Sequence, residues 1–422
     1  MSMTSQPRVL LSAYQCGPGM GSVSQIGWQW YSRLAAKLPV TLVTHVRNRE
    51  ALENAGAPLG DSQVIYIDTE WFAAPLYNFS TRLFPKSQHS AFLLSSADYY
   101  VYDREVVKQL KNQANNWDII HVPTPVSPNA ATRLYKLGLP MVVGPWNGGI
   151  QSPKNFPEIM KQDSMWLYPL RNIGKLTNKI LGGTRNASKI LVANQTTMNT
   201  VPKAHQAKCE ILLENAVDLD LFAAATYPVF PSKKLKKPLE LVYVGRLVPF
   251  KGISMLLEAM AQVKDKLPIN LTVIGEGPLA NEWQLLADNL GISEQVDWFG
   301  AADVDNIVEK LHAAHAFCLP SVRESGGAVL LEAMSCARPV IAIAFGGPAE
   351  VVDEEVGHAI PAEGKEVVIK ELVNTFYSIF KAPEAWQRRG EVGRQRAEQY
   401  YGWHSKINHA IQIYQDLIQK PS

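Results

Sequence analysis

The stretch RESGGAVLLEAM, residues 323–334, contains two glutamates, Glu324 and Glu332, with a Gly-Gly pair between them. It follows a continuous apolar run, 316–321, which is typical of a strand buried on both faces of a parallel sheet. A helical pattern begins at the glycines, and the first backbone N–H groups of a helix have no partner within it. Such donors can bind a phosphate oxygen, and here they would be those of Gly326, Gly327, Ala328 and Val329.

Short apolar runs alternate with helical patterns along the whole chain. The strands predicted in the first half are 8–13, 40–45, 63–68, 118–123, 141–146 and 189–194. The strands predicted in the second half are 239–245, 269–275, 296–300, 316–320, 339–345 and 358–362. After the first strand, apolar spacing predicts a helix with Ser22 as its N-cap. This alternation indicates an α/β fold with two doubly wound, Rossmann-like domains, whose ligands bind at the carboxyl ends of the strands in a cleft between the domains.

The boundary between the domains is predicted from composition. Three prolines and four lysines lie between Asp218 and Glu240 without sustained periodicity, so we interpret 217–238 as a linker. The domains are then 1–214 and 215–398. A helix predicted over 399–422 is expected to pack back on the first domain.

Composition excludes several classes of protein. A length of 422 residues favours two domains, and a net charge of +2 provides no overall field for nucleic acid. The N-terminus has no signal-peptide pattern, and no apolar run is long enough to span a membrane. The four cysteines show no CxxC spacing, so we expect reduced thiols in a cytoplasmic protein and no metal site.

Two cations mark the turn VGRLVPFKG, residues 244–252. Arg246 lies at the carboxyl end of a predicted strand and Lys251 at the start of the next helix. Arginine can bind two phosphate oxygens at once, and lysine acts as a point charge, so the pair suits a diphosphate. A basic turn with solvated side chains is the alternative.

A second glycine-rich turn, VIGEGPLA, occupies residues 273–280. It matches the loose pattern of a dinucleotide-binding loop, but Pro278 removes a backbone N–H, and the match falls in the second βα unit of its domain. We therefore interpret this turn, with Gly275, as the lining of a base pocket for another kind of nucleotide.

The two glutamates fit the same ligand. Glu324, before the turn, can accept a hydrogen bond from a hydroxylated group beside a bound phosphate. Glu332, about two helical turns further on, can accept hydrogen bonds from the vicinal diol of a ribose. The spacing suits a ligand with a sugar, a diphosphate and a ribose in line, whereas two ordinary helix-end glutamates are the alternative.

These motifs resemble those of retaining GT-B glycosyltransferases of the large family-four group. Glu324 and Glu332 match its E-x7-E motif, and GRLVPFKG matches its G-R-x-x-x-x-K-G. Similar motifs in the same order are NAVDLDLF (215–222), ESGGAVLLEAMSCARPVIA (324–342) and GGPAEVV (346–352). The N-terminal CGPGMGSVSQIGWQW, which includes Gly21, is similar to the glycine-rich first loop of one subgroup.

The resemblance implies that 215–398 binds a nucleotide-diphosphate sugar as donor substrate and that 1–214 binds the acceptor. It implies neither a metal nor another cofactor. Arg246 and Lys251 would neutralise charge on the leaving diphosphate, which is usually a large term in catalysis. The catalytic residues implied are Glu324, Arg246, Lys251 and His121. The donor-binding residues implied are Gly21, Gly245, Arg246, Lys251, Gly275, Gly300, Ser325, Gly326, Gly327, Ala328, Val329 and Glu332.

Two assignments in the first domain are less direct. His121 follows the family's pattern at a strand, but Pro123 stands where many members have a second histidine. His121 therefore either contacts the donor sugar or packs at the strand end. The loop GPWNGG, 144–149, resembles a G-P-x-G-G loop of the same subgroup, and Asn147 is its candidate contact to the acceptor.

Basic residues between 165 and 189 interleave with apolar ones, without an acidic residue. A basic amphipathic helix is typical of a peripheral membrane contact. The alternative is an ordinary domain helix with a basic solvent face.

Together these features predict a retaining, metal-independent hexosyltransferase. We expect it to move glucose from UDP-glucose to a glycan or lipid-linked acceptor in cell-surface polysaccharide synthesis, at the inner face of the membrane. A sucrose or trehalose synthase or phosphorylase acting on a free sugar is one alternative. A non-catalytic GT-B subunit is another.

Overall fold

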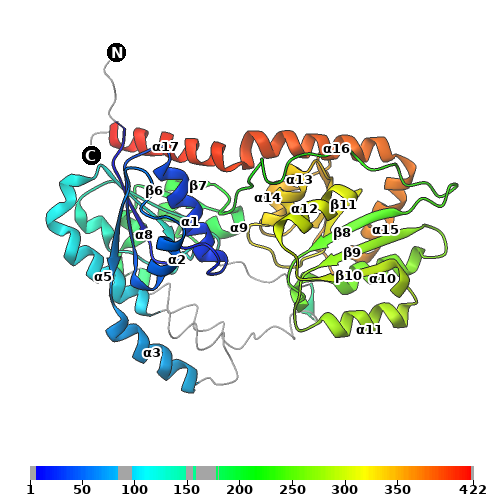
Figure 1. The fold of residues 1–422 in the computed structure, drawn as a ribbon, viewed down its shortest axis with the longest axis horizontal. Coiled ribbons are helices and arrows are strands. Elements are labelled where there is room, and N and C mark those ends of the chain that lie inside the picture. Colours follow the sequence, from blue (N-terminus) through cyan, green and yellow to red (C-terminus); the bar gives the residue numbers. More distant parts are fainter. Residues whose placement is uncertain (1–5, 84–96, 149–154, 158–176, 179, 420–422) are drawn as a thin grey trace, which may run out of the picture. The chain divides into compact units, whose positions relative to one another are not determined.

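The computed structural model describes residues 6–83, 97–148, 155–157, 177–178 and 180–419 (Figure 1). The chain forms two compact units, here called unit 1 and unit 2. Unit 1 comprises Met1–Gly149, Trp166–Glu214 and Lys406–Ser422, and unit 2 comprises Ile150–Met165 and Asn215–Ser405. That 1–214 binds the acceptor and 215–398 binds the donor stays a prediction.

Unit 1 is built on a parallel sheet of seven strands in the order β3-β2-β1-β4-β5-β6-β7. The strands are β1 (Val9–Ala13), β2 (Val40–His45), β3 (Gln63–Ile67), β4 (Ile119–Thr124), β5 (Met141–Trp146), β6 (Lys189–Val192) and β7 (Cys209–Ile211). The central strands β1, β2, β4 and β5 are buried along their whole length, as their continuous apolar sequences require.

The helices of unit 1 connect these strands. The α-helices are α1 (Ser22–Ala35), α2 (Arg49–Asn54), α3 (Glu70–Leu83), α5 (Asp98–Leu110), α8 (Gly183–Asn186) and α9 (Gln195–Met198). The 3-10 turns are η1 (Val46–Asn48), η2 (Lys111–Asn116), η3 (Leu134–Leu137) and η5 (Lys203–Lys208). Ser22 is the first residue of α1 and not its N-cap, which is Gly21 with a φ of 104°. The prediction of a serine cap was wrong.

Unit 2 has a parallel sheet of six strands in the order β10-β9-β8-β11-β12-β13. The strands are β8 (Leu239–Val244), β9 (Ile269–Ile274), β10 (Val296–Gly300), β11 (Ala316–Leu319), β12 (Val340–Ile343) and β13 (Gly357–Ile360). In each sheet the strand order reverses beside the first strand, at β1/β4 and at β8/β11, and such points are where α/β sheets bind ligands.

The helices of unit 2 follow its strands in alternation. They are α10 (Ile253–Val263), α11 (Ala280–Leu290), α12 (Val304–Ala313), α13 (Ala328–Ser335), α14 (Pro348–Val351), α15 (Lys365–Lys381) and α16 (Pro383–Arg396), with the short turns η6 (Pro249–Lys251), η7 (Ser293–Gln295) and η8 (Ala397–Tyr401). The last helix, α17 (Trp403–Gln419), belongs to unit 1 from Lys406 onward.

The predicted strands and the doubly wound fold are confirmed. All twelve predicted strands are present, each within two residues of its predicted bounds. The sequence did not reveal β7, because it is only three residues long and contains a glutamate.

The segment 217–238, interpreted as a linker between the domains, belongs to unit 2 and packs on it. Tyr227 donates a hydrogen bond from its hydroxyl to the carbonyl of His315 at 2.8 Å. Ser335 Oγ donates to the carbonyl of Phe222 at 2.6 Å. The prolines and lysines that suggested a linker therefore belong to an irregular segment that covers the unit.

Arg338 holds this segment from within the core of unit 2. Its side chain is fully buried, and its guanidinium donates to carbonyls at the end of α12, Leu311 at 2.9 Å and His312 at 2.9 Å. It also donates to the carbonyls of Ala225 at 3.4 Å and Thr226 at 3.1 Å. The negative end of a helix dipole favours a cation at this place.

We expect Arg338→Met to lower the free energy of unfolding by about 3 kcal/mol, because several buried carbonyls lose a charged donor at once. Urea unfolding of the full chain, followed by tryptophan fluorescence, measures this. The control is Arg388→Met on α16, where the arginine is exposed. Equal unfolding midpoints for the two variants would contradict the anchoring role.

Candidate functional site

The candidate site is formed by loops at the carboxyl ends of the strands of unit 2. The loops after β8 and β9 touch, since a Cβ placed on Gly275 would lie 2.1 Å from the carbonyl oxygen of Gly245. The backbone N–H of Gly275 donates to the carbonyl of Gly300 at the end of β10, at 2.7 Å. Three predicted donor-binding glycines from three successive strands are therefore brought together.

Lys251 and Glu324 form the central contact of the site. Lys251 Nζ lies 2.5 Å from Glu324 Oε2, and the exposed fractions of the two side chains are 14% and 15%. Lys251 ends η6 after β8, and Glu324 follows β11, so adjacent strands of the sheet carry the two charges. An ammonium group has three donors, so Lys251 can hold Glu324 and still donate to a ligand oxygen.

Arg246 is the more exposed of the two predicted cations. Its guanidinium makes no hydrogen bond or ion pair within residues 6–83, 97–148, 155–157, 177–178 and 180–419. Its backbone carbonyl is held instead, because it accepts a hydrogen bond from the Tyr243 hydroxyl at 3.1 Å. The backbone of Arg246 is thus held in place. Its exposed guanidinium group can donate hydrogen bonds to solvent or to a ligand.

The loop before α13 is held by the loop that contains Gly347. The sequence analysis matched that loop to a family motif but did not place it in the site. The backbone N–H of Gly347 donates to the carbonyl of Glu324 at 3.0 Å. A Cβ on Gly347 would lie 2.2 Å from the carbonyl oxygen of Ser325, so only glycine permits this approach. The motif GGPAEVV (346–352) gave the signal by which Gly347 could have been found.

α13 begins at Ala328, with Gly327 as its N-cap in a left-handed conformation. The backbone N–H of Leu330 already donates to the carbonyl of Gly327 at 2.8 Å. Ala328 and Val329 are therefore the first N–H donors of the helix proper, while Ser325 and Gly326 belong to the preceding loop.

Glu332 lies on α13. Its side chain is partly buried, and burial raises the pKa of its carboxyl to about 7. Among the described residues its carboxylate has no hydrogen-bond partner. A carboxyl group removed from water without a partner costs free energy, and perturbed groups of this kind are concentrated at functional sites.

His121 is enclosed within unit 1. It is fully buried on β4, where its Nε2 donates to the carbonyl of Gly144 at 2.7 Å and its Nδ1 accepts from the Tyr414 hydroxyl at 2.7 Å. Burial lowers the pKa of His121 to about 4, so the ring is neutral. Both ring nitrogens have partners within unit 1, as the packing alternative requires, and the catalytic assignment stays a prediction.

Asn147 and Gly21 lie in unit 1. Asn147 Nδ2 donates to Glu214 Oε1 at 2.9 Å, and its backbone N–H donates to the carbonyl of Val126 at 2.8 Å. Its amide nitrogen is thus held within unit 1, and contact with an acceptor stays a prediction. Gly21 caps α1 and is exposed.

The predicted membrane segment, 165–189, lies largely outside the described residues, and so does Gly149. Where the segment is described, Asn178 Nδ2 donates to the carbonyl of Pro128 at 2.7 Å, and Ile180 is exposed. In the described part of the chain, no helix is long and apolar enough to cross a membrane. Those residues also contain no group of three or more His, Cys, Asp or Glu side chains placed to hold a metal ion.

Residues 229–395 match the family described as glycosyl transferases, group 1. This part of the chain, which lies in unit 2, is therefore similar to members of that family. A D-inositol 3-phosphate glycosyltransferase from Segniliparus rotundus is 30% identical over 216 residues, which cover 48% of this chain and 46% of the relative. A glycogen synthase from Mycobacterium tuberculosis is 29% identical over 206 residues, which cover 48% and 47%.

The chain spans about half the length of these curated relatives of the group 1 family. A solved structure, HepE from Anabaena in complex with UDP, superposes with a TM-score of 0.64 at 16% identity and covers 97% of this chain and 100% of HepE. This likeness shows that the chain has the GT-B fold, with two Rossmann-like domains.

We expect Glu332→Gln to stabilise the protein at pH 8 but not at pH 4.5. The folded carboxyl has a raised pKa of about 7, so the folded state binds the proton more tightly than the unfolded state. Its contribution is therefore favourable at low pH and is lost as the pH rises toward 8, and glutamine does not titrate. Melting temperatures of both proteins across this range measure the difference.

The matched control is Glu309→Gln on α12, where the glutamate is exposed. A difference in melting temperature for Glu332→Gln that stays constant from pH 4.5 to 8 would contradict the raised pKa.

Proposed function

We propose that this chain transfers a hexosyl group from a nucleotide-diphosphate sugar to a hydroxyl of a glycan or lipid-linked acceptor. The ion pair between Lys251 and Glu324 carries this proposal, because it puts a cation and a carboxylate together beside the start of α13. The match of residues 229–395 to glycosyl transferases of group 1 supports it independently.

The donor would bind in unit 2 through groups that suit its successive parts. Lys251, Arg246 and the first N–H groups of α13 would bind the diphosphate, whose charge grows as the leaving group departs. Glu332 would accept hydrogen bonds from the ribose diol, which would compensate the burial of its carboxylate. Glu324 would accept hydrogen bonds from hydroxyls of the donor sugar.

We further propose that the donor sugar is glucose, that the base of the nucleotide is uracil, and that the configuration at the anomeric carbon is retained. HepE was solved in complex with UDP, which supports the base, and the E-x7-E spacing of Glu324 and Glu332 supports retention. The diphosphate would face two cations, Arg246 and Lys251, so we propose that no metal or further cofactor is needed.

We propose a cytoplasmic protein that contacts the inner face of the membrane reversibly through 165–189 and uses its acceptor in cell-surface polysaccharide synthesis. The interleaved basic and apolar residues of this segment support the contact. If the protein does not bind liposomes, the alternative that it acts on a free sugar gains support. If it hydrolyses UDP-glucose, the alternative of a non-catalytic subunit is excluded.

We expect Arg246→Ala and Lys251→Ala each to lower turnover of UDP-glucose by about 10²–10³, the usual cost of removing one preorganised charge stabiliser. Hydrolysis of UDP-glucose by the full chain measures this without knowledge of the acceptor. Lys370→Ala is the control, since this lysine is exposed on α15. Near-wild-type rates in both site variants would refute the diphosphate role.

We expect Glu332→Gln to weaken UDP binding, while Glu324→Gln leaves it nearly intact and lowers sugar transfer. Glu332 lies within α13, beyond the phosphate-facing start, whereas Glu324 lies before it and UDP has no sugar to contact it. Calorimetric titration with UDP separates the two. Equal weakening by both substitutions would overturn this division of roles.

A further inference from the structure

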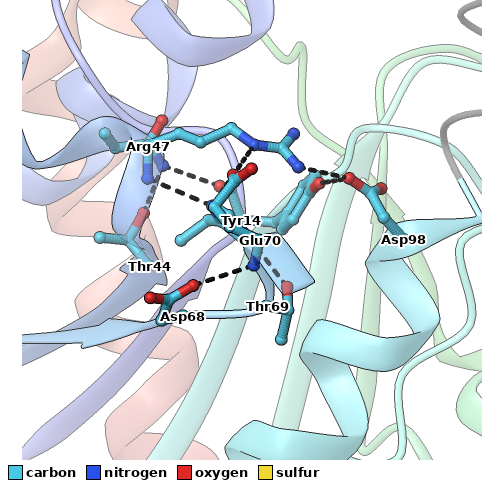
Figure 2. Close-up of polar contacts among 9 residues, drawn as sticks. Tyr14, Thr44, Arg47, Asp68, Thr69, Glu70 and Asp98 are labelled. Atoms are coloured by element: carbon cyan, nitrogen blue, oxygen red, sulfur yellow. Dashed lines mark hydrogen bonds and ion pairs between the residues drawn. The ribbon is translucent and has the colours of Figure 1, made fainter. Parts of the chain in front are cut away.

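A dense polar network lies at the carboxyl ends of the first three strands of unit 1 (Figure 2). Its centre is Arg47, which follows β2; Nη2 donates to Asp98 Oδ2 at 3.0 Å, and Nε donates to Glu70 Oε1. Tyr14, directly after β1, donates from its hydroxyl to the same Asp98 oxygen at 2.6 Å. We call Tyr14, Arg47, Glu70 and Asp98 the Arg47 network.

Neighbouring groups hold the Arg47 network in place. His45 Nδ1 accepts from the backbone N–H of Arg47 at 3.2 Å, and His45 Nε2 lies 2.9 Å from Thr69 Oγ1. Burial, and then the charge of Arg47, lower the pKa of His45, so its ring is neutral and adds no second cation. Figure 2 shows how the loops after β1, β2 and β3 contribute side chains to one place.

A hollow of about 530 Å³ opens beside this network. It is lined by Pro18 and Met20 from the loop after β1, by Arg47, and by Glu50, Ala51 and Asn54 of α2. Its volume lies within the range of small-molecule sites, and the carboxyl edge of such a sheet is where ligands bind.

The charges around the hollow favour an uncharged ligand. The charged residues that line the hollow are Arg47 and Glu50, one of each sign. Arg47 is also paired with Glu70 and Asp98, which do not line the hollow, so these four side chains together carry a charge of −2. Arg47 spends two of its five N–H donors on Glu70 and Asp98, which leaves three for other acceptors. Hydroxyl groups can accept from Arg47 and donate to Glu50, whereas a phosphate would be repelled by the surplus of carboxylates.

We propose that this hollow binds an uncharged, polyhydroxylated sugar unit of the acceptor, with Arg47 and Glu50 as its main hydrogen-bonding partners. The assignment rests on the proposed glycosyltransferase function and narrows its acceptor to a neutral saccharide end. Arg47 and Glu50 are specificity residues in this scheme, and the carboxylates on the far side of Arg47 fix its orientation.

Saturation-transfer NMR on the full chain, without donor, tests the assignment. The probes are the methyl α-glycosides of glucose, galactose and mannose, with glucose 6-phosphate as the anionic comparison. We expect transfer to at least one neutral glycoside, weaker transfer to glucose 6-phosphate, and at least a fivefold loss of the neutral signal in Arg47→Ala. Arg49→Ala is the matched control, because Arg49 stacks on Tyr66 and does not line the hollow.

Met20→Trp provides a second variant, should loss of the Arg47 network unfold unit 1. Met20 lines the hollow and its side chain is 43% exposed, so a larger side chain would fill the space and leave every ion pair intact. It should abolish the neutral signal, while circular dichroism and the melting temperature stay those of the wild type.

Three results would overturn the assignment. They are the absence of any neutral signal, a neutral signal that survives Met20→Trp, and a stronger glucose 6-phosphate signal that depends on Arg47. UDP added to the same samples reports on unit 2 separately. Failure of UDP to bind would count against the proposed function, whereas loss of the saccharide result alone would count against this inference.

Discussion

The contact between Lys251 and Glu324 is the interaction on which the arrangement of unit 2 depends. It joins the loops after β8 and β11, the two strands that flank the point where the strand order reverses. Each charge lies in a partly dehydrated place, and neither would be stable there without the other. The loop of Gly347 then fixes the backbone around Glu324. A ligand entering this edge meets groups whose positions are already set.

In unit 1 the loops at the carboxyl ends of the strands are held together by a different kind of contact. In unit 2 the loops approach through backbone, because glycines such as Gly275 and Gly347 leave room for a facing carbonyl. In unit 1 the loops after the first strands are joined through side chains, with Arg47 bound by two carboxylates. A phosphate needs N–H donors such as those at the start of α13, whereas the hydroxyl, guanidinium and carboxylate groups of unit 1 can exchange hydrogen bonds with the hydroxyls of a sugar.

The sequence predicted the regular elements well because buried parallel strands leave continuous apolar runs. It also predicted that Glu324 and Lys251 belong to one site, since both follow such runs at the strand end. It could not predict that His121 is enclosed, because its partners Gly144 and Tyr414 are distant in the chain. The segment around Tyr227 looked like a linker because its contacts depend on the buried Arg338, whose role has no local signal.

The raised pKa of Glu332 has a consequence for the thermodynamics of nucleotide binding. Near neutral pH its carboxyl is partly protonated in the free protein. A ribose diol that donates hydrogen bonds to it favours the ionised form, so binding would release a proton. Donor affinity would then rise as the pH increases through 7, and the enthalpy of binding would vary with the ionisation enthalpy of the buffer. A single carboxyl group would thereby couple the proposed binding of a nucleotide sugar to the proton concentration around the protein.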